Sequence, residues 1–378
     1  MSAVDVPRGV GAAAPPASSG DGAFARCVVA WQRMHGRHRL PWQGTRDPYR
    51  VWLSEIMLQQ TQVATVLGYY ERFLARFPDV RSLAAAPLDD VLALWSGLGY
   101  YGRARNLHRC AAVVAAGHGG EFPRDSAALQ RLPGIGRSTA AAIAAFCFGE
   151  RVAILDGNVK RVLARVLGFG DDLSEARHER ALWQHATALL PRHGDIGAYT
   201  QGLMDLGAAV CTARSPSCLV CPASAPCVAR REGAPERYPV KTRKTKRTRR
   251  DNAWLWLEHG GRVFLQRRPD SGVWAGLWTL PLFDDDAALH AAAARLGATV
   301  HALPPIDHAL THFDWRLRPY RADLARLPAD GALDAGRWVA HADLAGVALP
   351  APLRRLLASQ GGGAAGAGGV RGEPTPVA

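Results

Sequence analysis

Four cysteines near the middle of the chain lie close enough together to hold a metal. They fall within 17 residues at the spacing C-x6-C-x2-C-x5-C, as Cys211, Cys218, Cys221 and Cys227. Zinc ribbons use two C-x2-C pairs, whereas this segment has one such pair with a longer loop on each side. The pattern therefore favours a four-cysteine [4Fe–4S] cluster, with a zinc ion or a pair of disulfides as the alternatives. The other cysteines stand in apolar helical contexts that predict buried core positions, namely Cys27, Cys110 and Cys147.

A single carboxyl group stands in an otherwise uncharged helical stretch. Glu55 is the only charged residue between Arg50 and Glu71. Apolar residues recur at helical spacing from Trp52 to Val63, so we expect one helix there with Glu55 on its polar face. A carboxyl in a cleft of low polarity has a raised pKa and can act as an acid. An ordinary glutamate on a helix face is the alternative.

A second carboxyl, Asp156, follows the apolar run 152–155 and precedes the helical run 159–167. Its position alone favours a helix N-cap. About twenty residues earlier, residues 132–136 read Leu-Pro-Gly-Ile-Gly and lead into an Ala-rich helical run. Two glycines and a helix N-terminus suit a phosphate oxygen, although such a turn can also be purely structural. If the turn grips a phosphate, Asp156 lies where a deoxyribose could be presented, and Lys160 and Arg161 could add charge or simply face solvent.

Residues 97–105 combine glycines, tyrosines and arginines, in the order Gly-Leu-Gly-Tyr-Tyr-Gly-Arg-Ala-Arg. Aromatic rings beside basic groups suit stacking on nucleic-acid bases next to phosphates, and a packed aromatic turn is the alternative. Gln59 and Gln60 could fill a gap left in a base stack, or could be surface amides. These features raise the possibility of a nucleic-acid substrate.

Composition agrees with a polyanionic partner. The chain has 378 residues, 48% hydrophobic residues and a formal net charge of +13, which favours DNA, RNA or an anionic membrane surface. No apolar run approaches the roughly 20 residues that span a bilayer, and the first residues lack the pattern of a secretory signal. We therefore expect a cytoplasmic protein, associated with the nucleoid if its partner is DNA.

Changes of texture along the chain divide it into segments. Helical spacing dominates residues 23–238, and seven of the ten residues from 241 to 250 are basic, which predicts a solvated linker over 239–251. Short β-like runs around His259-Gly260-Gly261 predict a hairpin within a smaller α+β domain, residues 252–359, with helices near 287–296 and 349–357. We expect a disordered leader over 1–22 and a disordered tail over 360–378.

Together, the Glu55 helix, the 132–136 hairpin, the Asp156 segment and the cysteine loop resemble the helix-hairpin-helix base-excision glycosylases. The segments 52–66, 94–108 and 154–165 are very similar to the MutY adenine glycosylases in particular. In the endonuclease III branch, a lysine that forms a Schiff base stands two residues after the last hairpin glycine. This chain has Ser138 there. The resemblance implies a mainly α helix-hairpin-helix domain with a [4Fe–4S] loop, and a monofunctional enzyme without lyase activity.

The resemblance also implies roles for individual residues. Glu55 would protonate the flipped adenine and help activate water, Asp156 would stabilise the sugar cation, and Asn158 would orient the pair. Trp42, Gln201 and, with an uncertain role, Ser138 match positions of the adenine pocket. The remaining DNA contacts would come from Gln59, Gln60, Tyr100, Gly134, Gly136 and Lys160. The implied partner is double-stranded DNA with 8-oxoguanine:adenine or G:A mispairs, bound by a monomer.

The C-terminal domain resembles Nudix domains at residues 266–281. It lacks the glutamate-rich helix that holds metal in Nudix hydrolases, which argues against nucleotide hydrolysis. In relatives a Phe-Ser-His loop reads 8-oxoguanine, and this chain has Leu310 followed by Thr311, His312 and Phe313. A core histidine is the alternative for His312. Competing functions are an endonuclease III-like glycosylase and lyase for oxidised pyrimidines, a non-catalytic lesion-binding protein and a Nudix pyrophosphatase.

Overall fold

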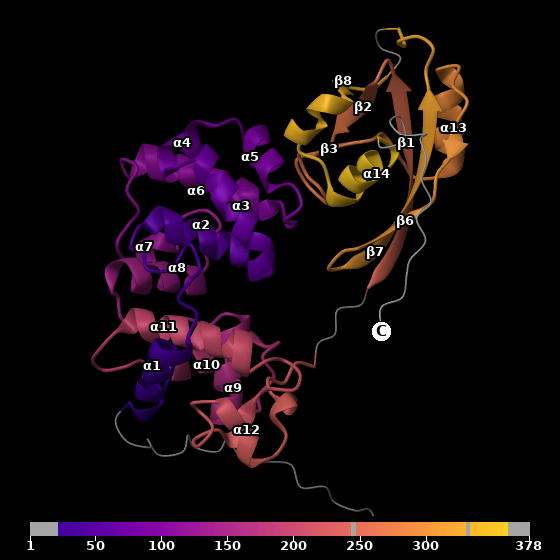
Figure 1. The fold of residues 1–378 in the computed structure, drawn as a ribbon. Helices are drawn as coiled ribbons and strands as arrows, with labels where there is room; N and C mark the ends of the chain where they lie inside the picture. Colours follow the sequence, from indigo (N-terminus) through magenta and orange to yellow (C-terminus); the bar gives the residue numbers. More distant parts are fainter. Residues whose placement is uncertain (1–21, 243–246, 330–332, 362–378) are drawn as a thin grey trace, which may run out of the picture. The chain divides into compact units, whose positions relative to one another are not determined.

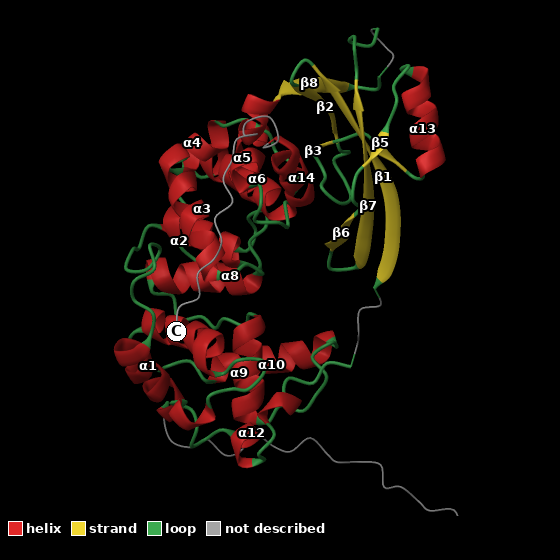
Figure 2. Ribbon diagram, turned by 45° about the vertical axis from the view of Figure 1, so that its right-hand side comes forward, coloured by secondary structure: helices red, strands yellow, loops and turns green. Residues whose placement is uncertain are grey.

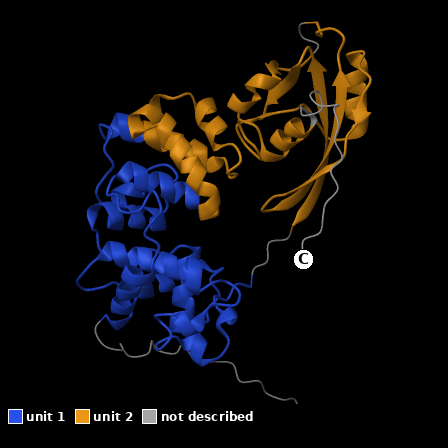
Figure 3. Ribbon diagram, viewed as in Figure 1, with its two compact units in different colours: residues 1–59, 113–244 blue, residues 60–112, 245–378 orange. Residues whose placement is uncertain are grey.

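The computed structural model describes residues 22–242, 247–329 and 333–361 (Figure 1). The chain divides into two compact units, each built from two chain segments (Figure 3). Unit 1 comprises the described residues of 1–59 and 113–244, and unit 2 those of 60–112 and 245–378. Residues 60–112, which belong to the helical stretch of the sequence, thus share a compact unit with the C-terminal domain.

Unit 1 is built from helices and loops (Figure 2). Its α-helices are α1 (Ala23–His35), α2 (Pro48–Leu58), α7 (Ser126–Leu129), α8 (Arg137–Ile143), α9 (Gly157–Leu167), α10 (Ala176–Ala188), α11 (Ile196–Asp205) and α12 (Val228–Arg231). Two π-helical turns, Ala144–Phe148 and Leu206–Val210, continue α8 and α11, and 3-10 turns lie at Cys218–Val220 and Pro235–Arg237. The apolar faces of α9, α10 and α11 meet in one core, where Leu163, Leu182 and Leu203 are buried.

Aspartates set the starts of several helices in unit 1. The side chains of Asp47, Asp125, Asp156 and Asp195 each accept a hydrogen bond from an amide in the first turn of the helix that follows. Such caps satisfy backbone donors that have no partner within the helix. The N-cap expected for Asp156 is therefore present, and it fixes where α9 begins.

The helix that carries Glu55 is shorter than predicted. α2 ends at Leu58, and a new helix, α3 (Val63–Arg76), begins after the cap residue Gln62. The expectation of one helix from Trp52 to Val63 is therefore wrong. Gln60 has a φ of 56°, in the left-handed region, which turns the chain between the two helices.

Unit 2 combines helices with a sheet. Its α-helices are α3, α4 (Val80–Ala85), α5 (Leu88–Trp95), α13 (Asp286–Arg295) and α14 (Ala351–Gly361), and α6 (Gly102–Gly117) runs across the boundary between the units. A 3-10 helix lies at His341–Gly346. The strands are β1 (Thr248–His259), β2 (Arg262–Arg267), β3 (Trp278–Thr279), β4 (Leu282–Phe283), β5 (His301–Ala302), β6 (Ile306–Ala309), β7 (Phe313–Asp323) and β8 (Gly336–Ala340).

The eight strands form one mixed sheet. Its main order is β3-β2-β1-β7-β5, with β4 beside β1, β6 beside β7 and β8 beside β2. β1 and β7 run parallel, and the other pairs are antiparallel. The predicted hairpin is confirmed, because β1 and β2 pair around Gly260 and Gly261, which both have positive φ angles. The helices expected near 287–296 and 349–357 correspond to α13 and α14.

The end of the basic segment differs from the expected linker. β1 begins at Thr248, within the range 239–251. The positive charges there are accommodated because Arg247 pairs with Asp314 and the guanidinium of Arg250 lies 4.2 Å over the ring of Phe313. The expected disorder of 1–22 and 360–378 is wrong at their inner ends, because Gly22 is the N-cap of α1 and α14 continues to Gly361. The rest of both segments, and residues 243–246 of the linker, lie outside the described residues. No helix of the described part is long and apolar enough to cross a membrane.

Candidate active site and cysteine site

The structure brings the two predicted catalytic carboxyls into electrostatic reach of each other. Glu55, on α2, is partly buried, and this burial together with the negative charge of Asp156 raises the pKa of Glu55 to about 8. Burial also raises the pKa of Asp156, but hydrogen bonds from the amides of Val159 and Asn158 oppose that rise. Glu55 is therefore the carboxyl that holds a proton at neutral pH.

Asp156 is fixed from both sides along the chain. Its Oδ1 accepts from the amide of Val159 at 2.7 Å. One residue earlier, the amide of Leu155 donates to Oγ of Ser138 at 3.0 Å. Ser138 stands in the first turn of α8, directly after the glycine hairpin. The serine at the position of the lyase lysine is thus a structural tie between the hairpin helix and the segment that presents Asp156.

The side chain of Asn158 is held by Arg161. Nη2 of Arg161 donates to Oδ1 of Asn158 at 2.9 Å and to the carbonyl of Gly207 at 2.6 Å, and its Nε donates to the carbonyl of Cys211 at 2.8 Å. Gly207 packs so closely that a Cβ there would lie 2.7 Å from Cβ of Asn158. The first turn of α9 is therefore packed against the π-helical turn that leads into the cysteine loop.

The predicted phosphate grip has the expected local form. Gly134 has a φ of 76°, and Gly136 is the N-cap of α8. Both glycines are exposed, whereas Leu132 and Ile135 are buried and anchor the turn. Lys160 does not simply face solvent, because it forms an ion pair in which its Nζ lies 2.7 Å from Oε1 of Glu179. The two glycines are thus exposed at the turn, whereas the charge of Lys160 is paired with Glu179.

The other predicted residues of unit 1 have varied surroundings. Trp42 is buried, with 8% of its surface exposed. Nε2 of Gln59 donates to Oγ1 of Thr139 at 3.4 Å. Gln201 donates to the buried carboxylate of Asp205 at 2.8 Å, and Arg37 forms an ion pair with the same carboxylate at 2.7 Å. The amide nitrogen of Gln201 is therefore engaged in this network, and its place in an adenine pocket stays a prediction.

In unit 2, the turn after α5 presents one tyrosine and buries the next. Tyr100 has a φ of 49° and is 48% exposed, whereas Tyr101 is buried. Nη2 of Arg103 donates to the carbonyls of Leu98 and Gly99 and so holds the turn. The hydroxyl of Tyr100 lies 3.4 Å from Oγ1 of Thr311. Tyr100, a predicted DNA contact, thus lies beside Thr311 of the predicted lesion loop. Gln60, another predicted DNA contact, is also exposed.

The predicted lesion loop is only partly exposed. Thr311 and His312 lie on the surface, so the alternative of a core histidine is wrong for His312. Phe313 begins β7 and is 6% exposed beneath the guanidinium of Arg250. Thr311 and His312 can therefore meet a ligand directly, whereas the Phe313 ring supports the loop from below.

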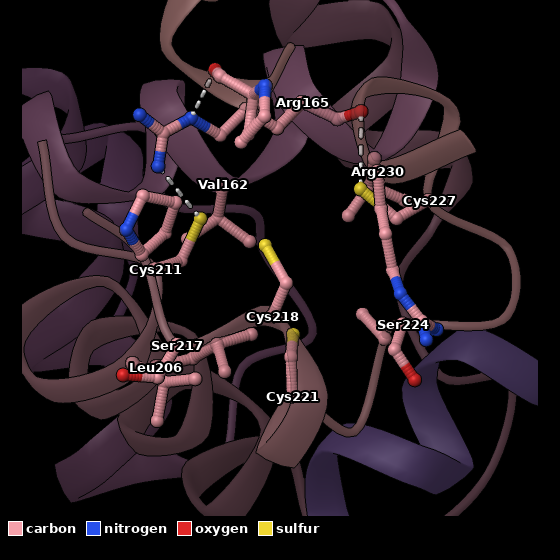
Figure 4. Close-up of a pocket in the computed structure, with 15 residues that line it drawn as sticks. Val162, Arg165, Leu206, Cys211, Ser217, Cys218, Cys221, Ser224, Cys227 and Arg230 are labelled. Atoms are coloured by element: carbon pink, nitrogen blue, oxygen red, sulfur yellow. Dashed lines mark hydrogen bonds between the residues drawn. The ribbon is translucent and has the colours of Figure 1, made fainter. Parts of the chain in front are cut away.

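The four clustered cysteines line one pocket, together with Val162 and Arg165 of α9 (Figure 4). Burial raises the pKa of Cys221 to about 11, and the other three sulfurs contribute to that rise. All seven cysteines are free thiols, so the disulfide alternative is not observed. Among the described residues, no three His, Cys, Asp or Glu side chains converge as ligands of a metal ion. Cys110 and Cys147 are buried as predicted, but Cys27 is exposed, because it lies on the solvent side of α1.

Comparisons with known proteins agree with this arrangement. Residues 53–187 match the HhH-GPD superfamily of base excision DNA repair proteins, and residues 252–359 match the NUDIX domain. The adenine DNA glycosylase of Buchnera aphidicola subsp. Acyrthosiphon pisum is 36% identical over 308 residues, which cover 81% of this chain and 87% of that protein. The chain belongs to the adenine DNA glycosylase family. The family resemblance and the fold class predicted from the motifs are therefore confirmed.

Other relatives extend this assignment. The adenine DNA glycosylase of Mus musculus is 32% identical over 400 residues, covering 88% of this chain and 77% of the mouse protein. The solved structure of a thermostable thymine-DNA glycosylase is 30% identical with a TM-score of 0.50, over 55% of this chain and 95% of that one. Adenine DNA glycosylases thus share most of this chain, and the thymine-DNA glycosylase shares the fold of about half of it.

Gly207 and Arg165 also organise the site of this adenine DNA glycosylase family member and are not predicted by the residue pattern, whereas Arg161, expected to face solvent or DNA, has a structural role instead. Arg161 bonds Asn158, Gly207 packs against it, and Arg165 contacts Cys211. Arginines on a helix are normally solvated, so nothing in the residue pattern marks Arg165 as buried. A glycine within a helical run was the one available signal for Gly207, because glycine there weakens a helix unless close packing requires it.

Proposed function

We propose that this protein hydrolyses the N-glycosidic bond of adenine paired with 8-oxoguanine in double-stranded DNA, and acts more weakly on G:A. The observation that carries the proposal is the carboxyl pair, in which Glu55 has a pKa of about 8 beside the N-capping Asp156. Two carboxyls with separated proton affinities are what acid-assisted glycosidic cleavage requires. We further propose that the protein acts as a monomer.

The proposed reaction uses the two carboxyls in sequence. Glu55 donates its proton to N7 of the flipped adenine, and the electrons of the breaking C1′–N9 bond leave with the base. The carboxylate of Asp156 stabilises the positive charge that develops on the sugar. A water molecule then adds to C1′ and passes its proton to the Glu55 carboxylate, which restores the acid. Asn158, held by Arg161, positions the first turn of α9 beside this reaction.

Other residues would hold the DNA. The exposed Gly134 and Gly136 amides at the start of α8 suit one phosphate group. Tyr100 and Gln60 are exposed and would enter the base stack near the mispair. Thr311 and His312 would read 8-oxoguanine, with Phe313 as their support. Trp42 and Gln201 are proposed to line the adenine pocket.

We also propose that Cys211, Cys218, Cys221 and Cys227 hold a [4Fe–4S] cluster. The four soft sulfur donors fit an iron–sulfur cluster or zinc, and they surround one pocket with an apolar wall at Val162. The spacing of the four cysteines, with a single C-x2-C pair between longer loops, favours the cluster over zinc. Such a cluster would tie the ends of the loop together and could exchange an electron.

The test uses duplexes that contain 8-oxoguanine:adenine, G:A, thymine glycol:adenine or only normal pairs. Strand breaks are scored with and without hot alkali. The expected result is alkali-dependent breakage at adenine, fastest opposite 8-oxoguanine. Breakage without alkali at thymine glycol would replace the proposal with an endonuclease III-like lyase. Asp156→Asn and Glu55→Gln should each abolish turnover and retain DNA binding, and turnover by either variant would refute the mechanism.

A further inference from the structure

Arg165 is a fully buried cation in the wall of the cysteine pocket. It lies in the last turn of α9 and is 2% exposed. Its Nε donates to the carbonyls of Pro235 at 2.8 Å and Tyr238 at 3.2 Å. Burying a charge costs several kcal/mol unless another charge compensates it. Whether the charge of this guanidinium is compensated therefore depends on the groups that it contacts.

The remaining donors of Arg165 face the start of the cysteine loop. Nη1 donates to Sγ of Cys211 at 3.3 Å (Figure 4). Nη1 also donates to the carbonyl of Thr212 at 2.6 Å, and Nη2 donates to the carbonyl of Ala213 at 3.0 Å. The guanidinium thus holds backbone on both sides of the loop, just after its first cysteine and after its last. Carbonyls orient the group but do not neutralise it.

No ion pair of the described residues includes Arg165, and its hydrogen-bond acceptors are carbonyls and the sulfur of Cys211. The nearby charge is also positive, because Arg161 lies close enough for the two cations to oppose each other. A metal group held by four thiolates has a net negative charge, and hydrogen bonds from a guanidinium to a thiolate are strengthened by that charge. The uncompensated positive charge of Arg165 in the pocket wall therefore suits an anionic group in the pocket.

We propose that Arg165 is a positioning residue that supplies the counter-charge of an anionic metal–thiolate group at the four cysteines. It holds Cys211 in place and ties residues 211–213 to residues 235–238, so that retention of the metal depends on this one side chain. The inference rests on the proposed cluster, but it can fail independently of it.

The experiment compares full-length Arg165→Met, Arg165→Lys and Arg230→Met with the unmodified protein. Arg230 lines the same pocket but is exposed, so its replacement removes the same charge from a solvated position. Iron and acid-labile sulfide are measured per chain, and the loss of visible absorbance is followed under an iron chelator. Because a charge-assisted contact is lost, Arg165→Met should release iron about tenfold faster, and Arg230→Met less than about twofold.

The reduction potential of the proposed cluster distinguishes the loss of the Arg165 charge from the loss of its packing. Arg165→Met should make the cluster harder to reduce, whereas Arg165→Lys should keep a potential near that of the unmodified protein and still lose iron faster, because lysine lacks the planar fork. If Arg165→Met does not fold, Arg165→Lys alone must show accelerated iron loss. Unchanged iron retention in the Arg165 variants would overturn this inference and leave the cluster in place. Zinc, or no metal, in the unmodified protein would instead overturn the cluster proposal.

Discussion

The raised pKa of Glu55 makes a direct prediction about the pH dependence of excision. With a pKa of about 8, Glu55 is about 90% protonated at pH 7, whereas a glutamate with the ordinary pKa of 4.5 would be about 0.3% protonated. The protonated form is the acid, so the rate should be nearly constant below pH 7. Above pH 8 it should fall about tenfold for each pH unit.

The assay is the single-turnover rate of adenine release from an 8-oxoguanine:adenine duplex between pH 5.5 and 10, with saturating enzyme. Affinity for a non-hydrolysable duplex is measured at each pH, because loss of binding would imitate loss of the acid. Glu175→Gln is the matched control, since Glu175 is exposed and lies in the same unit. Its profile should superimpose on that of the unmodified protein. A rate that stays constant to pH 9.5, or that rises with pH, would refute the acid role of Glu55.

Two further predictions concern packing and stacking. Gly207→Ala places a Cβ 2.7 Å from that of Asn158, so it should cost about 1–3 kcal/mol in unfolding free energy and slow single-turnover excision at least about tenfold. Gly170→Ala, which meets no atom within 4 Å, should change neither, and equal melting temperatures and rates for the two variants would contradict the packing argument. Tyr100→Ala should reduce the rate ratio of 8-oxoguanine:adenine over G:A about tenfold by loss of stacking. Thr311→Val, which removes the hydroxyl proposed to read 8-oxoguanine together with its 3.4 Å contact with Tyr100, should also reduce that ratio, and an unchanged ratio would remove Thr311 from lesion reading.

Much of the fold follows from local sequence. The two glycines at 260 and 261 predict the hairpin that joins β1 to β2, and the change from helical to strand spacing predicts where the sheet lies. The break between α2 and α3 was not predictable, because Gln60 is not a residue that normally adopts a positive φ. Nor did the basic composition of 241–250 predict the start of β1, which depends on pairing with β7, about 65 residues later.

The candidate site, like the fold, could be predicted only in part from the sequence. The types and spacing of Glu55, Asp156 and the four cysteines are visible in the sequence, because each role depends on a side chain's own chemistry. The supports are not visible, since Arg161 and Arg165 owe their roles to backbone carbonyls at 207, 211–213 and 235–238. The ring of Phe313 and the thiol of Cys27 likewise could not be assigned to core or surface before the neighbouring elements were known.

The N-cap role of Asp156 bears directly on its proposed catalytic role. A helix cap and a catalytic role need not be alternatives for Asp156, because the cap's hydrogen bonds favour the ionised form that the proposed chemistry uses. Burial raises the pKa of Asp156 above its ordinary value, and the amides of Val159 and Asn158 with the charges of Arg161 and Lys160 oppose that rise. Burial and the negative charge of Asp156 both raise the pKa of Glu55. The helix start therefore favours the ionised form of Asp156 more than its burial alone would, and the negative charge of that form favours the protonated form of Glu55.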